Sequence, residues 1–309
     1  MLFLFTQKTF HTMYAFKPHI IFLSLLISSF ISFAQDSPNF FRIGLIADIQ
    51  YADKADSKTR FYRSSDHKLQ EAVASLNKED LAFTAVLGDL VDEGPKDLQP
   101  IMDLLNQLNA AHYQLLGNHD YPKVYEHDLY RQFDMPHPYY TVEKDNWQFI
   151  FLNTNELASY AVEEGSKLER AYQKLITQVK AEGRSNAQPW NGGIAKKQFK
   201  WLKRKLKAAE REGKKVVVFS HHPFLPANGL ETLNSPELIA LFVKYNTVKA
   251  VISGHHHPGN FEMYEGIPFI TLEGMVETVD NAFGYMDIYP NKLIIHGEGR
   301  LTSRELPIR

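Results

Sequence analysis

The chain contains no cysteine among its 309 residues. This absence excludes disulfide bonds, thiolate metal ligands, cysteine nucleophiles and a lipid anchor on cysteine. An excess of charge of one sign is also lacking, because 34 basic residues stand against 36 acidic ones, for a formal net charge of −2. A chain with this balance lacks the excess of basic residues that binds a phosphate backbone, so nucleic acid is not an expected partner. Any chemistry must come from oxygen and nitrogen side chains.

No hydrophobic run is long enough for a comfortable membrane span. The most apolar stretch, residues 20–33, is shorter than the ~20 residues that a membrane helix needs. Two lysines and no acidic residue precede it, and it ends in small residues that suit cleavage after Ala34. We predict a signal peptide at residues 1–34, with translation from Met1 or Met13, an exported mature chain and no stable membrane insertion. The alternative is an uncleaved N-terminal membrane anchor.

The remainder, residues 35–309, is predicted to be a single α/β domain. Three short apolar runs end on polar clusters, in the segments RIGLIAD, FTAVLGD and HYQLLGNHD. Apolar spacing between these runs predicts helices at about residues 64–77 and 98–108. Strand, helix and strand in alternation are typical of an α/β sheet whose strands are buried on both faces.

The second half of the chain continues this pattern and then changes it. WQFIFLNTN predicts a fourth strand, and helices are predicted at about residues 166–182 and 196–212. Two further strands end in histidines, in KKVVVFSHHP and VKAVISGHHHP. From Phe261 to Ile295 apolar and polar residues alternate between turns, which predicts antiparallel strands without an intervening helix.

Five predicted strand ends carry side chains that bind metals or protons. In open α/β sheets the carboxyl ends of strands are where such folds build their sites. Carboxylates, amides and imidazoles without sulfur suit Mn²⁺, Fe or Zn²⁺, and they are too many for one ion. The set predicts two metals that share a bridge, which suits phosphoryl chemistry. Its members are Asp48 with Gln50, Asp89, Asn118 with His119, His221, and His255 with His257.

The ordered motifs DIQ, GDLVD, GNHD, SHHP and GHHH resemble those of the calcineurin-like metallophosphoesterases. The segments IADIQYAD, FYRSSDHKLQEAV, WNGGIAKKQFKWL and LEGMVETVDNAFGYMDIYPNKLIIHGEGR resemble the manganese-dependent ADP-ribose/CDP-alcohol diphosphatases within that superfamily. The resemblance implies two mixed β-sheets packed face to face and flanked by helices, a four-layer α/β sandwich with a dinuclear metal centre.

Residue roles follow from the resemblance. One metal is expected on Asp48, Gln50, Asp89 and His257. Asp89 is expected to bridge to a second metal on Asn118, His221 and His255. His119 is then no ligand but acts on the substrate, protonating the leaving oxygen or stabilising charge there, and Asp120 is expected to orient it.

The resemblance also implies a reaction and cofactors. We expect two divalent ions, Mn²⁺ ahead of Fe or Zn²⁺, and hydrolysis of the pyrophosphate bond of nucleotides such as ADP-ribose and CDP-alcohols. Arg60 and Arg63 are candidates to pair with a phosphate, and Tyr62 or Trp190 to stack a base; the alternatives are surface arginines and core aromatics. The sequence names no protein partner. Phosphomonoester or cyclic-nucleotide hydrolysis, or metal-dependent binding without turnover, stay open.

Overall fold

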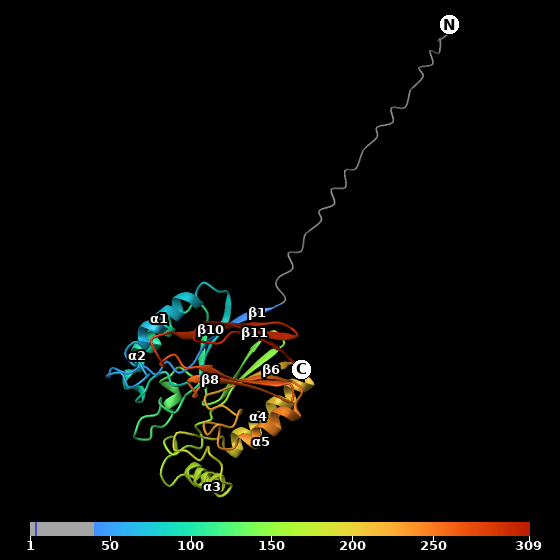
Figure 1. Cartoon of the computed structure of the whole chain (residues 1–309). Coiled ribbons are helices and arrows are strands. Elements are labelled where there is room, and N and C mark those ends of the chain that lie inside the picture. Colours follow the sequence, from blue (N-terminus) through green and yellow to red (C-terminus); the bar gives the residue numbers. More distant parts are fainter. Residues whose placement is uncertain (1–3, 5–39) are drawn as a thin grey trace. The chain divides into compact units, whose positions relative to one another are not determined.

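Two β-sheets of six strands each carry the fold, with helices along them (Figure 1). The computed structural model describes residue 4 and residues 40–309. Apart from Leu4, the predicted signal peptide therefore lies outside the described residues. In the described part of the chain, no helix is both long and apolar enough to cross a membrane.

The first sheet has the order β12-β11-β10-β1-β2-β3. The neighbours β1, β2 and β3 run parallel, and β10, β11 and β12 join them in antiparallel pairs. Its strands are β1 (Phe41–Ile46), β2 (Leu81–Val86), β3 (His112–Gln114), β10 (Ala282–Ile288), β11 (Lys292–Gly299) and β12 (Arg304–Pro307).

The second sheet has the order β4-β5-β6-β7-β9-β8. The strands β5, β6, β7 and β9 are parallel neighbours, while β4 and β8 form antiparallel edges. Its strands are β4 (Tyr140–Lys144), β5 (Trp147–Phe151), β6 (Lys215–Ser220), β7 (Val248–Ser253), β8 (Pro258–Tyr264) and β9 (Ile267–Glu273). Both sheets are mixed, which confirms the expected architecture.

The core lies between the sheets because side chains from both inner faces meet there. Phe83 of β2 and Phe149 of β5 have ring centroids 4.9 Å apart, and both are almost fully buried. Such aromatic pairs add to the stabilisation from apolar burial, by about 0.5–1.5 kcal/mol each. The packed core fixes the two sheets against each other, and so fixes the spacing of the loops at their carboxyl edges.

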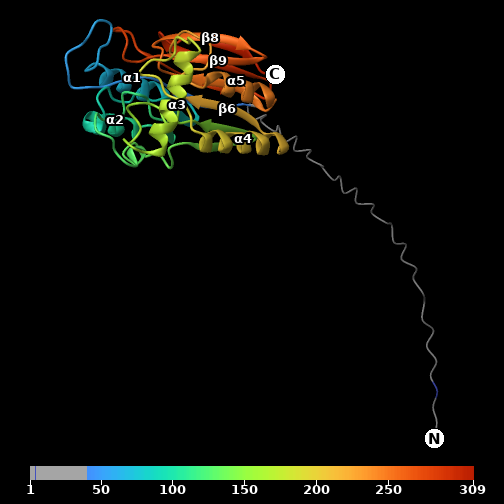
Figure 2. The ribbon, with the colours of Figure 1, turned by 90° about the horizontal axis from the view of Figure 1, so that it is seen from below.

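Helices shield the outer faces of the sheets (Figures 1 and 2). On the second sheet, Leu202 and Leu206 of α4 pack with Phe242 of α5 in one apolar cluster with β6 and β7 residues. The helices are α1 (Ser65–Leu76), α2 (Leu98–Leu105), α3 (Lys167–Ala181), α4 (Lys196–Arg211) and α5 (Ser235–Lys244), with short 3₁₀ turns at Pro95–Asp97 and Leu129–Arg131.

Three elements were not predicted from the sequence: β4, β12 and α5. In addition, β9 is antiparallel to β8 but parallel to β7, so the C-terminal strands do not form a purely antiparallel group. The crossover through α5 explains why β6 and β7 can be parallel neighbours, since parallel strands need a long connection between them.

Candidate metal centre

The carboxyl ends of five strands from both sheets meet at one place. Asp48 lies two residues after β1, and Asp89 lies three after β2. Asn118 follows β3 in the loop, His221 comes directly after β6, and His255 and His257 follow β7. Because the strands converge at one edge, residues far apart in sequence share a small buried volume.

Two groups of residues, which share one member, could each hold an ion. Within each group the ligand atoms lie within 4.8 Å of one another. One group is Asp89, His221 and His255; the other is Asp48, Asp89 and His257. Asp89 belongs to both, and it is 1% exposed. A carboxylate has two oxygens, so one side chain can contact two cations. This arrangement is what a shared bridging ligand requires.

The backbone at these positions is strained. Asp48, Gln50, Asp89 and His255 have φ values of 52°, 48°, 50° and 71°. Left-handed conformations of residues other than glycine cost of order 1–3 kcal/mol and cluster at functional sites. In the motif GNHD, a Cβ on Gly117 would lie 2.1 Å from Asp89 Oδ1, so only glycine lets the loop approach this carboxylate.

Each of the three histidines in these groups has one ring nitrogen held by a fixed acceptor. His221 Nδ1 donates to the carbonyl of Leu87 at 2.9 Å. His257 Nδ1 donates to Glu277 Oε1 at 2.9 Å. A carbonyl or carboxylate can only accept, so the proton sits on Nδ1 in both histidines. The other ring nitrogen, Nε2, keeps its lone pair and faces the candidate metal site.

The third histidine follows the same rule through an amide. Asn191 donates its Nδ2 to the carbonyls of Asn186 and Gly229, so its Oδ1 is the atom that faces His255. His255 Nε2 lies 3.2 Å from that oxygen and donates to it, which leaves Nδ1 as an acceptor. Partners of this kind are typical of metal-bound histidines, whose orientation and tautomer they fix.

These acceptors crowd around one point. Asn118 Oδ1, His255 Nδ1 and Asp89 Oδ2 lie 3.0, 3.2 and 3.3 Å from His221 Nε2. Lone pairs at such distances repel unless they share a cation. Burial lowers the pKa of His221, but Asp89 and Asp48 together raise that pKa to about 9, which shows that this cluster of acceptors favours a positive charge. The donor set therefore fits a divalent metal.

The side-chain oxygen of Gln50 gives independent support for a metal ion at this site. Its Nε2 donates to Asp92 Oδ1 at 2.6 Å, which fixes the amide. Its Oε1 is fully buried, and no described residue donates to it. A buried acceptor without a partner costs about 1–3 kcal/mol. A metal ion would remove that cost.

His119 is held differently from the other histidines. Its Nδ1 lies 2.9 Å from Asp92 Oδ1 and donates to this carboxylate, so Nε2 is left for the substrate side. Burial lowers the pKa of His119, but the charges of Asp89 and Asp92 outweigh this effect and raise it. His119 belongs to neither metal group.

The prediction that Asp120 orients His119 is wrong. Asp120 Oδ1 accepts from the Val91 amide at 3.0 Å, and its Oδ2 accepts from the Gly117 amide at 2.8 Å. Both oxygens are thus used to hold the backbone of the two neighbouring loops. Asp92, the second acid of GDLVD, takes the orienting role.

Residues 41–259 match the family model described as calcineurin-like phosphoesterase. The chain belongs to this family. The match confirms the resemblance seen in the motifs, and the chain is a metal-dependent phosphohydrolase.

The similarity to known proteins extends beyond the residues that the family model matches. The manganese-dependent ADP-ribose/CDP-alcohol diphosphatases of Oryza sativa subsp. japonica and Homo sapiens are each 27% identical to this chain. The alignments cover 86% and 88% of this chain and 94% of each relative. A solved dimetal phosphatase from Danio rerio shares the fold, with a TM-score of 0.79 and 24% identity over 87% of this chain and 99% of that one.

A cavity of about 530 Å³ opens onto the metal centre of this phosphoesterase. Two of the four predicted substrate-binding residues line it, Arg60 and Trp190. Arg60 Nε lies 3.5 Å from Glu277 Oε1, which ties the guanidinium to the carboxylate that also holds His257. Trp190 is 44% exposed, so its ring can meet a ligand.

The other two predicted substrate-binding residues, Tyr62 and Arg63, do not line this cavity. Tyr62 is 6% exposed and packs with Ala52 and Val276 in a small core cluster, so its ring has no free face for a base. Arg63 lies outside the cavity lining and pairs with Asp53 at 2.8 Å on the surface. In the segment TRFYRS, only the first arginine lines the cavity.

Three residues that position this phosphoesterase's site were missed from the sequence: Asp92, Asn191 and Glu277. Each stands inside a motif that was recognised, namely GDLVD, WNGG and LEGMVET. Their roles depend on contacts with distant segments, such as the 2.9 Å contact of Glu277 with His257. The only signal was a polar residue within each recognised motif.

Proposed function

We propose that this chain hydrolyses the pyrophosphate bond of nucleoside diphosphate compounds such as ADP-ribose and CDP-alcohols, with two Mn²⁺ ions as cofactors. The pairing of two candidate metal groups through Asp89 carries the proposal. The printed names of the rice and human relatives supply the substrate class and the metal. A site with two cations suits a substrate with two adjacent phosphates.

The chain's own residues divide into two metal sets. Asp48, Gln50 and His257 would hold one ion, and Asn118, His221 and His255 the other, with Asp89 between them. When bound, the ions would supply a nucleophilic hydroxide near neutral pH and offset the negative charge of the phosphate under attack. Glu277, Asn191 and the Leu87 carbonyl would keep the three imidazoles turned towards the ions.

His119 would act on the substrate. It lines the cavity, and with Nδ1 bonded to Asp92 its Nε2 can give a proton to the leaving oxygen. The Asp92 carboxylate stabilises the imidazolium form, which is the form that donates. Arg60 would pair with the second phosphate, and Trp190 would stack on the base or sugar.

A product assay tests the proposal. The protein with Mn²⁺ should convert ADP-ribose into AMP and ribose 5-phosphate, and His119→Ala should lose roughly 10²-fold to 10⁴-fold in kcat while keeping its metals. Phosphate release from simple monoesters, with ADP-ribose left intact, would support the phosphomonoesterase alternative. If the protein binds ADP-ribose in the presence of metal but shows no turnover that His119→Ala removes, the result would support the binding-protein alternative.

We also propose that the chain is exported. The apolar run at residues 20–33 and the small residues around Ala34 support this. An exported enzyme would meet nucleotides outside the cytoplasm and release phosphorylated fragments from them.

A further inference from the structure

A second cavity, of about 680 Å³, shares no lining residue with the cavity at the metal centre. Its walls come from the loop after Asp120, the segments on either side of β4 and β5, and the start of α4. Its volume falls in the range of about 300–1,000 Å³ that small-molecule sites occupy. Neither the metals nor the proposed hydrolysis uses it.

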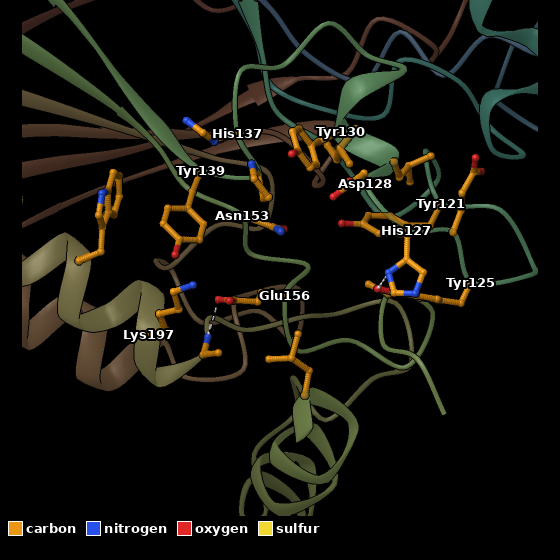
Figure 3. A pocket seen from close by; sticks show the side chains of 18 residues that line it. Tyr121, Tyr125, His127, Asp128, Tyr130, His137, Tyr139, Asn153, Glu156 and Lys197 are labelled. Atoms are coloured by element: carbon orange, nitrogen blue, oxygen red, sulfur yellow. Dashed lines mark hydrogen bonds between the residues drawn. The ribbon is translucent and has the colours of Figure 1, made fainter. Parts of the chain in front are cut away.

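Aromatic rings form much of its wall (Figure 3). Tyr139 lies on the side of α4, while Tyr121 and Tyr125 lie across the cavity from it. Trp201 also lines the cavity, with its ring centroid 4.8 Å from that of Tyr139. The faces of aromatic rings carry partial negative charge and attract cations, most strongly when the cation has lost its water.

The ionised groups of the cavity favour a cation as well. Glu126, Asp128 and Glu156 line it, against a single lysine, Lys197. Asp128 is paired with Arg131 at 3.4 Å, so its charge is partly balanced. Glu126 and Glu156 have no cationic partner within 4.0 Å among the described residues. The remaining balance is negative.

Glu156 is the best-placed of these carboxylates. Its Oε2 accepts from the Ala195 amide at 2.8 Å and from Gln198 Nε2 at 2.7 Å, which fixes the side chain. No described residue donates a hydrogen bond to its Oε1. Figure 3 shows this carboxylate below Tyr139 in this view, pointing towards the start of α4 near Lys197. The donors to Oε2 thus hold the carboxylate in place, and Oε1 is the oxygen left for a ligand.

We propose that this cavity is a binding site for a small organic cation, an alkylated ammonium compound held between the tyrosine and tryptophan rings and the Glu156 carboxylate. Alkyl groups on nitrogen suit the aromatic walls, and the spread positive charge needs no strong hydrogen bonds. A metal ion suits the cavity poorly, because none of the groups of described residues that could hold an ion lies in its wall. The site is independent of the proposed hydrolysis.

Nuclear magnetic resonance can test this at single-site resolution. The chain has three tryptophans, so ¹⁵N-tryptophan labelling gives three indole signals, assigned by Trp→Phe variants. Trp201 lines the second cavity, Trp190 lines the catalytic cavity, and Trp147 is 2% exposed. Titration with choline chloride, against sodium chloride, should move the Trp201 signal saturably and leave Trp190 unchanged. The neutral analogue 3,3-dimethylbutan-1-ol should bind about tenfold more weakly.

Charge variants sharpen the test. Glu156→Gln keeps the shape and an acceptor oxygen, and should weaken choline binding about tenfold; Glu164→Gln removes the same charge from an exposed position outside the cavity and should have no effect. Lys197→Gln should tighten binding, whereas Lys200→Gln, exposed on the same helix outside the cavity, should not.

Three outcomes would overturn the proposal. They are a Trp201 signal that does not saturate, equal affinity for choline and its neutral analogue, and a response at Trp190 instead of Trp201. If Glu156→Gln loses helical signal or melts early, the Lys197→Gln and Lys200→Gln pair still decides the matter, because both lysines are exposed and neither forms an ion pair in the described structure.

Discussion

Replacing Asp92 by Asn should damage the proton chemistry of His119 while leaving the fold intact. Asp92 Oδ1 accepts from His119 Nδ1 at 2.9 Å and from Gln50 Nε2 at 2.6 Å, and Lys54 donates to the other oxygen. Asn retains one acceptor oxygen of similar shape but removes the negative charge. A hydrogen bond to a charged group contributes about 1.5–3 kcal/mol, so kcat should fall roughly tenfold to 150-fold.

The pH profile gives a readout that a structural defect does not mimic. The charges of Asp89 and Asp92 raise the pKa of His119, so its protonated form persists to higher pH than burial alone would allow. If the protonated form is the donor, activity is lost as pH rises through this pKa. Asp92→Asn lowers the pKa, so the basic limb of kcat should move to lower pH, by about one unit or more.

Asp120→Asn is the matched control. Asp120 accepts two backbone amides, from Val91 and Gly117, and does not contact the His119 ring through any described hydrogen bond. In Asp120→Asn the side-chain NH₂ would face one of these backbone N–H groups, which should lower the free energy of unfolding by about 1–3 kcal/mol. The basic limb of the pH profile should not move. Both variants should be assayed at saturating Mn²⁺. A basic limb that shifts for Asp120→Asn and stays for Asp92→Asn would refute the assignment.

Further predictions concern the metals, the substrate and the N-terminus. Gln50→His replaces an amide oxygen by a nitrogen ligand, so the ratio of Zn²⁺-supported to Mn²⁺-supported activity on ADP-ribose should rise; an unchanged ratio contradicts a ligand role for Gln50. Asn118→Ala should lower metal content measured by elemental analysis, whereas His119→Ala should not. Arg60→Ala should raise KM for ADP-ribose about tenfold, and Arg63→Ala, which removes a side chain that is 61% exposed, should leave KM unchanged. Mass spectrometry of the mature protein should find an N-terminus near Gln35; an intact Met1 or Met13 in a soluble cytoplasmic form speaks against export.

The strand ends were predictable from sequence because each apolar run stops at the residue that carries the chemistry. Asp48, Asp89 and His221 follow β1, β2 and β6 within three residues, and parallel buried strands bring their carboxyl ends to one edge. The two-sheet architecture required the family resemblance, since local periodicity does not reveal which strands pair. The helix α5 was missed although Pro236 and Glu237 stand in its first turn.

Side-chain orientation was the part that sequence could not supply. Asp120 is next to His119 in GNHD, whereas Asp92 lies 27 residues earlier in GDLVD, and only the loop geometry shows that Asp120 is used by backbone amides and that Asp92 reaches the imidazole. Tyr62 and Arg63 stand beside Arg60 in the chain, yet one is buried and the other faces solvent. Partners such as Glu277 come from segments distant in sequence, and no local pattern identifies them.

Metal stoichiometry tests the central claim, a pair of ions that share Asp89, most directly. Elemental analysis after dialysis against Mn²⁺ and removal of free metal should find two ions per wild-type chain. Asp48→Ala removes a ligand of one predicted group only, and should leave about one ion; Asp89→Ala removes the shared ligand and should lose both. Circular dichroism on each variant confirms the fold. A wild-type protein with a single ion, or an Asp89→Ala protein that keeps one ion as tightly as Asp48→Ala does, would contradict the bridged centre.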